Sequence, residues 1–419
     1  MRVVLVTFAL GCAGLVGGVS GQTVRTWTSN SDQRWNRGAN WSGNNAPDTN
    51  NEIAQFGTGT QLNPQLNANN LTVRGLRFSS GAAAYDVGDN NGARTLRIGN
   101  GSSGFVENLS GSDQLISIAT LQFQSDATLR TAGTGMLTID SNLTGNNRDL
   151  AFTAAADIRV TGDITTGTGT LTKDGAGSLR LSGSNAYTGP TRIDAGAIVL
   201  EAANVFSDAS VIDIGTGAAL RLDGYSDTVA GISGTGNVDL GADGFLTLGA
   251  GTSTFAGSFL GSGTLVISSG ATLTLGADFA NTNLNITLAG GTLRLAGHSF
   301  NAGSLDVTSN SIIDFAAGAP SVFDITALTF GSGGVQLAVQ NWTDAADYFF
   351  SQAGYVQGSA PLNQIQFQGW TTNDTKWQSY DSQVTPVPEP RAFGAALLAL
   401  ALAAVWWRRR AAVRGCQAG

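Results

Sequence analysis

Short runs in which apolar and polar residues alternate recur along the middle of the chain. The run at residues 95–98 reads Thr-Leu-Arg-Ile, and the run at residues 292–295 reads Thr-Leu-Arg-Leu. A period of two places the aliphatic side chains on one face of a strand and threonine, arginine or serine on the other. Glycine, asparagine and aspartate between the runs supply turns. No helical period is visible between residues 60 and 340, so the pattern predicts an all-β body.

Strands this short cannot bury an apolar face alone. Stacking each strand on the next in successive coils creates a thin apolar core along one axis. The spacing between runs varies from about eight residues to the mid-twenties, which is consistent with two or three strands per coil. We therefore expect a right-handed parallel β-helix over residues 61–340. A β-sandwich is the competing architecture, because the spacing is irregular.

The tryptophans lie at the two ends of the chain. None occurs between residues 42 and 341; the positions are Trp27, Trp35, Trp41, Trp342, Trp370, Trp377, Trp406 and Trp407. A narrow coil has little room for an indole ring, whereas the exposed strand edges at the ends of a solenoid need bulky covers. We expect aromatic-rich caps at residues 22–60 and 341–378. Carbohydrate-binding platforms are the alternative role for these tryptophans.

The termini predict export. Residues 1–21 combine Arg2 with an apolar run and the small residues Val19-Ser20-Gly21, which is typical of a cleaved signal peptide. An uncleaved anchor is one alternative, and lipid attachment at Cys12 is another. Cys416 is the second of the two cysteines, so residues 22–387 contain no thiol and can form no disulfide, thiolate metal site or Cys nucleophile.

The exported body is acidic and poor in catalytic side chains. Residues 22–387 hold 16 Lys and Arg against 29 Asp and Glu, a net charge of −13, which argues against nucleic-acid binding. Its one histidine, His298, lies in a turn, and its three glutamates are Glu52, Glu107 and Glu201. We expect no catalytic residue, cofactor or metal site. Carboxylates paired in space would instead indicate a polysaccharide-active β-helix enzyme, a lyase or hydrolase.

A second apolar segment lies near the C-terminus. Val387-Pro388-Glu389-Pro390 ends a linker at residues 379–390, Arg391 follows, and an uncharged run extends from Ala392 to Trp407. Arg408, Arg409 and Arg410 then form a basic stop, with a tail at residues 411–419. We expect a transmembrane helix and stop over residues 391–410, with the arginines and the tail in the cytoplasm. An ordinary tail anchor behind a stiff proline linker remains the alternative.

These C-terminal elements resemble the PEP-CTERM sorting tail of certain Gram-negative bacteria. The resemblance covers Val387 to about Arg410 and rests on the Pro-Glu-Pro triplet, the apolar helix and the basic stop. It implies recognition by an exosortase, a membrane protease, with cleavage near Pro388, Glu389 and Pro390. The tail beyond the arginines is longer than is usual in that family.

Residues 175–196 resemble the autotransporter-associated β-strand repeat. They contain a strand, the sequence Ser-Gly-Ser-Asn-Ala-Tyr-Thr-Gly, then Thr191 and another strand, with Pro190 in place of a usual glycine. The resemblance implies a β-helical passenger and brings no catalytic residue. We thus expect an exported surface or matrix protein, structural or adhesive, associated with exopolysaccharide and anchored transiently in the inner membrane before processing.

Overall fold

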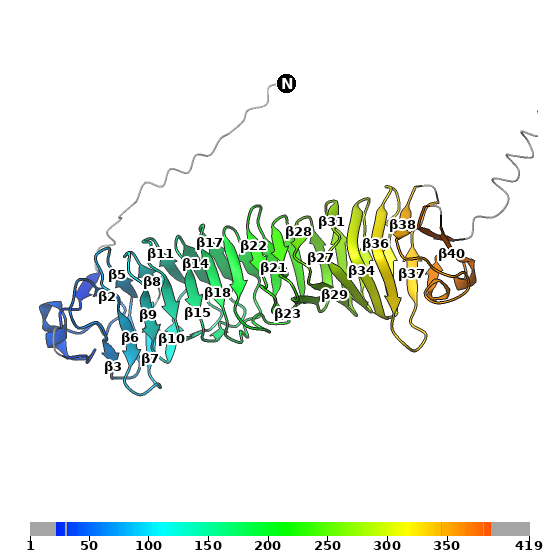
Figure 1. Cartoon of the computed structure of the whole chain (residues 1–419). Helices are drawn as coiled ribbons and strands as arrows, with labels where there is room; N and C mark the ends of the chain where they lie inside the picture. The colour runs from blue at the N-terminus through cyan, green and yellow to red at the C-terminus, as the bar shows by residue number, and fades with distance from the viewer. Residues whose placement is uncertain are drawn as a thin grey trace, which may run out of the picture.

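The computed structural model describes residues 22–29, 32–99, 101, 103–344, 346–379 and 381–386. These residues form a long rod in which strands stack along one axis (Figure 1). In chain order, most coils contribute one strand to each of three faces, which we call face 1, face 2 and face 3. The predicted parallel β-solenoid is confirmed, and the β-sandwich alternative is wrong.

Face 1 is a sixteen-stranded parallel sheet that runs the length of the rod. At a strand spacing of about 4.8 Å, such a sheet extends about 70 Å. Between Gly104 and Asp314, aligned residues in neighbouring coils are 20 to 23 positions apart, as in Ala127, Leu150, Leu171 and Thr191. Toward the two ends the separation rises to as much as 30, from Gly75 to Phe105. The strands of face 1 are β1 (Thr23–Thr26), β2 (Glu52–Phe56), β5 (Gly75–Phe78), β8 (Gly104–Asn108), β11 (Ala127–Thr131), β14 (Leu150–Ala154), β17 (Leu171–Asp174), β19 (Thr191–Ile193), β21 (Val211–Ile214), β24 (Gly231–Gly234), β27 (Gly251–Phe255), β30 (Ala271–Leu275), β33 (Thr292–Arg294), β35 (Ser311–Asp314), β37 (Leu337–Gln340) and β39 (Ile365–Phe367).

Face 2 is a ten-stranded parallel sheet that stops at β28. The next strand at this position in the coil is β31 (Phe279–Asn281), which pairs with β34 and not with β28. Face 2 is therefore interrupted once. Its strands up to the interruption are β3 (Gln65–Leu66), β6 (Asp86–Asp89), β9 (Gln114–Ser117), β12 (Leu137–Ile139), β15 (Ile158–Val160), β18 (Ser178–Leu181), β20 (Ala197–Leu200), β22 (Ala219–Arg221), β25 (Asn237–Asp239) and β28 (Ser258–Leu260).

Face 3 has two sections. The first holds β4 (Leu71–Val73), β7 (Thr95–Ile98), β10 (Thr120–Phe123), β13 (Asn142–Gly145) and β16 (Ile164–Thr165). The second begins with β23 (Ser226–Val229), β26 (Phe245–Leu248), β29 (Thr264–Ser268) and β32 (Asn285–Ala289). The longer strands β34 (Ser299–Ser309) and β36 (Val322–Phe330) then span faces 2 and 3 in one piece, and β38 (Tyr348–Ser351) pairs with the face 2 half of β36.

The core is a stack of apolar residues at the inward positions of the strands. In β11, β14 and β30, buried and partly exposed residues alternate strictly, as the period of two predicts. Leu129 and Phe152 are aligned in neighbouring coils and are fully buried. Burying a side chain of this size contributes about 1.5–3 kcal/mol. Each coil covers the core of the next, so the stack stabilises the rod over its whole length.

Side chains at the corners also connect successive coils. The backbone N–H of Asp163 donates to Asn142 Oδ1 over 3.0 Å, and the N–H of Ser184 donates to Asp163 Oδ1 over 2.8 Å. At another corner the N–H of Asp149 donates to Asp126, and the N–H of Thr170 donates to Asp149. Aspartate and asparagine therefore satisfy turn amides of the neighbouring coil that no strand pairs.

The residues that resemble the autotransporter repeat fill the gap in face 3 between β16 and β23. Asn185 Oδ1 accepts a hydrogen bond from Ile164 N (2.8 Å), and its Nδ2 donates to Val205 O (2.8 Å). One amide side chain thus bridges the coil before it and the coil after it. The buried Tyr187 hydroxyl lies 2.6 Å from Thr191 Oγ1, which is 3.2 Å from Ser210 Oγ. The Asn, Tyr and Thr of the motif are structural.

A tryptophan cluster closes the N-terminal end. Trp27, Trp35 and Trp41 are almost fully buried, and the ring of Trp41 packs edge-on against those of Trp27 and Trp35, at 5.0 and 4.8 Å between centroids. The 3₁₀ turns η1 (Gly38–Asn40) and η2 (Ser42–Asn44) carry this segment over the end, and β2, inside the predicted cap, joins face 1. Three buried indoles cannot serve as an exposed carbohydrate platform.

The C-terminal end is covered by a different device. The strands β40 (Thr375–Gln378) and β41 (Gln383–Pro386) form an antiparallel hairpin, and β41 pairs with β38. The 3₁₀ turns η3 (Leu362–Gln364) and η4 (Thr372–Asp374) flank β39, and Thr375 Oγ1 donates to Ile365 O over 2.7 Å. Reversing strand direction at the end of a parallel stack hinders further coils, or a second molecule, from pairing there.

Replacing Trp41 tests the N-terminal cap. The substitution W41A removes a buried indole, a change that costs about 3–5 kcal/mol in protein cores. We expect hydrogen exchange of the β1 and β2 amides to accelerate at least tenfold, whereas the amides of β27 and β30 keep their protection. The matched control is V24A, at a side chain 41% exposed on β1. Equal protection at both ends in W41A would show that the cluster does not hold the cap.

Candidate functional site

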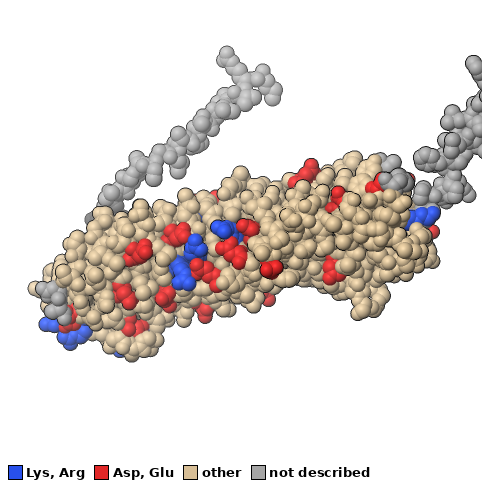
Figure 2. All heavy atoms as spheres, viewed as in Figure 1, with Lys and Arg blue, Asp and Glu red and all other residues tan. Residues whose placement is uncertain are grey.

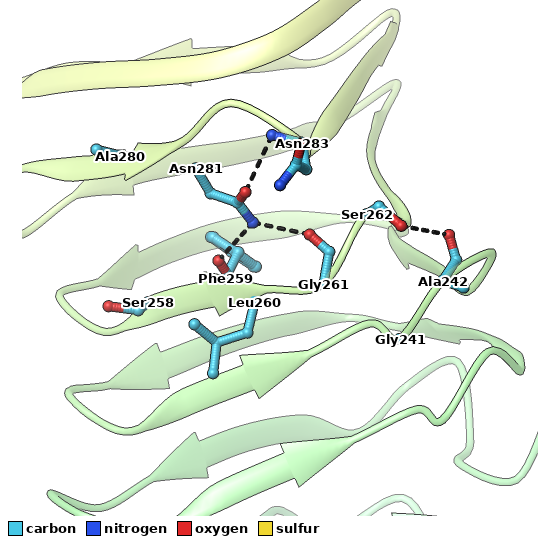
Figure 3. A pocket seen from close by; sticks show the side chains of 10 residues that line it. All are labelled: Gly241, Ala242, Ser258, Phe259, Leu260, Gly261, Ser262, Ala280, Asn281 and Asn283. Atoms are coloured by element: carbon cyan, nitrogen blue, oxygen red, sulfur yellow. Dashed lines mark hydrogen bonds between the residues drawn. The ribbon is translucent and has the colours of Figure 1, made fainter.

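The interruption of face 2 leaves a hollow on the surface of the rod. It has a volume of about 610 Å³ and lies between β28 and β31, next to the preceding turn at Gly241 and Ala242 (Figure 3). Its lining residues carry no charge. Ser258, Ser262 and Asn283 present polar side chains there, and Leu260 is 42% exposed. The hollow therefore offers hydrogen-bonding groups beside a small apolar surface.

Asn281 closes the unpaired edge of β28 beneath the hollow. Its Nδ2 donates to Phe259 O (3.1 Å) and to Gly261 O (2.9 Å), and its Oδ1 accepts from Asn283 N (3.0 Å), as the dashed lines in Figure 3 show. A strand edge with free carbonyls would pair with any extended peptide. Here one side chain satisfies both carbonyls, so the hollow does not present a free strand edge on that side.

A ladder of phenylalanine rings supports this part of face 2 from inside. It consists of Phe259, Phe279, Phe300, Phe323 and Phe349, with successive centroids 5.7, 4.8, 5.9 and 5.2 Å apart. All five rings are buried. Aromatic contact between Phe259 and Phe279 spans the step at which β28 and β31 lack backbone pairing, so the rod stays continuous below the hollow.

The outer side chains above this ladder form a second surface, which we call the face 2 strip. It extends from the hollow over β34 and β36 to β38. One row aligns Ala280, Asn301, Asp324 and Phe350, and a parallel row aligns Ser299, Val322 and Tyr348. The rings of Tyr348 and Phe350 are nearly parallel, with an interplanar angle of 5° and centroids 5.7 Å apart. Gln352 Nε2 donates to Asp324 Oδ1 over 3.2 Å beside them.

His298 lies at a corner next to this strip. Its Nδ1 is 3.3 Å from Asp278 Oδ1, and the Asp278 side chain is 75% exposed. The hydrogen bond from Ser299 N, aided by His298, holds the pKa of Asp278 below its usual value. The pair is open to solvent, whereas a catalytic histidine and carboxylate work in a site that excludes water. We interpret it as a corner contact, in agreement with the solvated turn expected from the sequence.

The glutamates of the body are held in ion pairs. Glu52 pairs with Arg25, Glu107 lies between Arg77 and Arg130 on face 1, and Glu201 Oε2 is 2.6 Å from Arg159 Nε on face 2. Figure 2 shows basic side chains next to acidic ones and a surface that is otherwise mostly uncharged. The Glu201–Arg159 pair is partly exposed and contributes at most about 1 kcal/mol, whereas the side chains of Glu52 and Glu107 are only 6% and 5% exposed. Because each glutamate is paired with an arginine, none is a free general acid or base.

Lys173 is the more buried of the two lysines. Its Nζ donates to the carbonyl oxygens of Asp174, Gly175 and Ala195 at 3.0, 2.7 and 3.0 Å. Burial lowers the pKa of Lys173 to about 8, and the carboxylates of Asp174 and Asp157 partly oppose this shift. A perturbed pKa in a cleft would suggest a functional site. Lys173 instead faces the core and satisfies three carbonyls at a corner, which is a structural role.

Asp227 on β23 is also buried. Its Oδ2 accepts hydrogen bonds from Val205 N (2.8 Å) and Phe206 N (3.0 Å), so it continues the side-chain bridge that Asn185 begins. Its Oδ1 has no hydrogen-bond partner. Burial raises the pKa of Asp227 to about 6, and the nearby Asp208 carboxylate adds to the rise, although the two backbone bonds oppose it.

The described residues hold no group of three or more His, Cys, Asp or Glu side chains that could bind a metal ion. Within the same ranges, no helix has the length and apolar character needed to cross a bilayer. The sorting residues Val387, Pro388, Glu389 and Pro390, the signal peptide at 1–21 and the transmembrane segment with Arg408, Arg409 and Arg410 lie outside the described residues. These assignments stay predictions.

The face 2 strip was not predicted from the sequence. In Tyr348-Phe349-Phe350 the alternation puts two aromatic residues on the outer side of a strand. These residues were instead predicted to belong to the C-terminal cap at residues 341–378. The hollow left no sequence signal, because nothing in residues 258–283 marks where β28 fails to pair with β31.

Comparisons with known proteins identify the repeat. A family model described as the passenger-associated-transport-repeat matches residues 171–200, which contain β17 to β20. An alignment of 211 positions, which covers 46% of this chain, shows 39% identity to the adhesin BmaC autotransporter of Brucella suis biovar 1 (strain 1330). This chain covers 6% of the length of that relative. No solved structure matches. The predicted resemblance to the autotransporter-associated repeat is confirmed.

Replacing Asp227 tests its burial. The folded protein binds this proton more tightly than the unfolded chain, so the contribution of Asp227 to the free energy of unfolding falls as the pH rises from about 4 through 6. D227N cannot ionise. The difference in unfolding free energy between D227N and the wild type should therefore grow between pH 4 and 7.5, by up to about 3 kcal/mol for a shift from 3.8 to about 6.

Urea denaturation at a series of pH values measures this difference. D48N, at an exposed carboxylate near the N-terminal end, is the control and should follow the wild type closely. A constant difference between D227N and the wild type across this pH range would mean that Asp227 ionises as freely as in the unfolded chain.

Proposed function

We propose that this chain is an exported structural and adhesive protein of the bacterial surface or extracellular matrix, without enzymatic activity. The observation that carries the proposal is the architecture: a rod built on one continuous sixteen-stranded sheet, with both ends covered. Such a body holds its outer faces at a distance and presents them over a length of about 70 Å. The winding we infer is right-handed, the sense that parallel crossover connections almost always take.

Two further findings support an adhesive rather than a catalytic role. The repeat at residues 171–200 is of a type named for transported passengers, and about half of the chain is similar to part of an adhesin. The glutamates and Lys173 are engaged in ion pairs or carbonyl contacts that explain their positions. A polysaccharide lyase or hydrolase would need such groups free in a cleft.

We also propose that residues 387–410 sort the protein. In this scheme the signal peptide directs export, the helix within 391–410 anchors the precursor transiently in the inner membrane, and an exosortase cleaves near Pro388, Glu389 and Pro390. Exopolysaccharide is the partner we infer for the released or attached body, whose acidic charge disfavours nucleic acid. The resemblance to the PEP-CTERM tail supports this sorting scheme. It consists of the Pro-Glu-Pro triplet, the apolar run that ends at Trp407 and the three arginines after it.

Deleting the gene in the source bacterium tests the surface role. Cells that lack the protein should attach more weakly to surfaces, or retain less matrix, by severalfold, and complementation with the full-length gene should restore the defect. Antibody labelling of intact cells checks the location. Attachment that is unchanged, together with a protein that antibodies reach only after cell lysis, would contradict an exported adhesive function.

The sorting scheme is tested separately at Glu389. E389A should accumulate as a membrane-held precursor, whereas the wild-type protein should end near residue 389 when its mass is measured. D381A, upstream of the triplet, serves as the matched control and should be processed normally. Exported wild-type protein that retains an intact tail would exclude exosortase cleavage while leaving the adhesive function open.

A further inference from the structure

We propose that the face 2 strip binds an uncharged polysaccharide chain that lies along the axis of the rod. The proposal rests on the surface function proposed above and identifies where on the rod the ligand is bound. The strip begins at the hollow between β28 and β31 and ends at the aromatic pair on β38. Its five strands are consecutive at one position of the coil.

The hollow supplies directional contacts for sugar hydroxyls. Ser258 and Asn283 are exposed there, and neither carries a charge. A hydroxyl both donates and accepts, and an amide does the same through different atoms, so the site can bind hydroxyl groups of either orientation. Leu260, 42% exposed, gives the same hollow an apolar surface suited to the C–H face of a pyranose ring.

The aromatic pair supplies the second anchor. Tyr348 is 37% exposed, and Phe350 is partly exposed next to it with a nearly parallel ring. Exposed aromatic rings offer large, rigid contact areas at a small cost in conformational entropy. Asp324, aligned with Phe350 and hydrogen-bonded to Gln352, places a carboxylate acceptor at the edge of the platform.

Charge selects among polysaccharides. Asp324 carries the one charged side chain that points outward from the face 2 strip. This holds for the described residues of β28, β31 and β38 and of the face 2 halves of β34 and β36. A chain rich in uronate or sulfate would meet this carboxylate and the net charge of −13 without any arginine or lysine on the strip to pair with. An uncharged chain meets no such repulsion.

The geometry favours a glycan over a peptide. A peptide that adds a strand needs free carbonyls and amides along a sheet edge. At the one interruption of face 2, Asn281 already satisfies the carbonyls of Phe259 and Gly261. The strip also repeats with the spacing of stacked strands, about 4.8 Å. A polymer of similar units laid along the axis can therefore make comparable contacts on successive coils.

The test is binding of the purified full-length chain to an array of uncharged and acidic oligosaccharides, with affinities then measured by calorimetry. The probes are hexamers of glucose, mannose and xylose in several linkages, with oligogalacturonate as the charged counterpart. We expect at least one uncharged series to bind and oligogalacturonate to bind at least tenfold more weakly. Y348A/F350A should weaken binding tenfold or more, and S258W, which fills the hollow, should also weaken it.

The matched controls are Y225A and F245A, which remove aromatic side chains 40% and 46% exposed that lie outside the strip. Both should bind like the wild type, and thermal unfolding should show that all variants are folded. Unchanged affinity in Y348A/F350A, or no binding to any uncharged probe, would overturn the strip as a glycan site. The gene-deletion experiment tests the surface function separately. If cells need the protein for attachment but Y348A/F350A supports attachment normally, the surface function is retained and only the glycan site is excluded.

Discussion

The parallel hydrogen-bond ladder of face 1 is the interaction on which the rest of the rod depends. It is the one sheet that joins every coil, from β1 to β39, while faces 2 and 3 are each interrupted. Because face 1 holds the coils in register, the other faces can lose backbone pairing locally without the rod coming apart. The two interruptions are stabilised differently. Asn185 and Asp227 bridge face 3 with polar side chains, whereas Phe259 and Phe279 span face 2 with aromatic contact.

These interruptions are also where the surface becomes distinctive. Over most of its length the rod presents threonine, serine and ion-paired arginine, which suit contact with solvent. Where β28 and β31 separate, the outer face gains depth and loses charge. The phenylalanine ladder beneath allows this, because its bulky rings hold the coils together without backbone bonds at that step. The missing backbone pairing between β28 and β31 and the candidate site thus share one physical origin.

The sequence was sufficient for the architecture and insufficient for the site. Alternation such as that of residues 95–98 depends on local side-chain preference, so it identified the strands and the solenoid. The burial of Trp27, Trp35 and Trp41 followed from their size and their location at one end. The alignment of Asn301, Asp324 and Phe350 depends on coil lengths of more than twenty residues, which local patterns do not reveal. The hydrogen bonds of Asn185 with the backbones of Ile164 and Val205 were likewise not predictable from the sequence, although the repeat that contains Asn185 was recognised.

The closed coil, which takes 20 to 23 residues over the central part of the rod, has a consequence for how such proteins change over time. Gain or loss of a single residue within a strand would turn inward side chains outward over the rest of that strand. A duplication of one whole coil keeps all three faces in phase and leaves both terminal covers untouched. Length can therefore evolve in whole steps of one coil, independently of the sequences that seal the ends, and populations of related genes should differ by multiples of that unit.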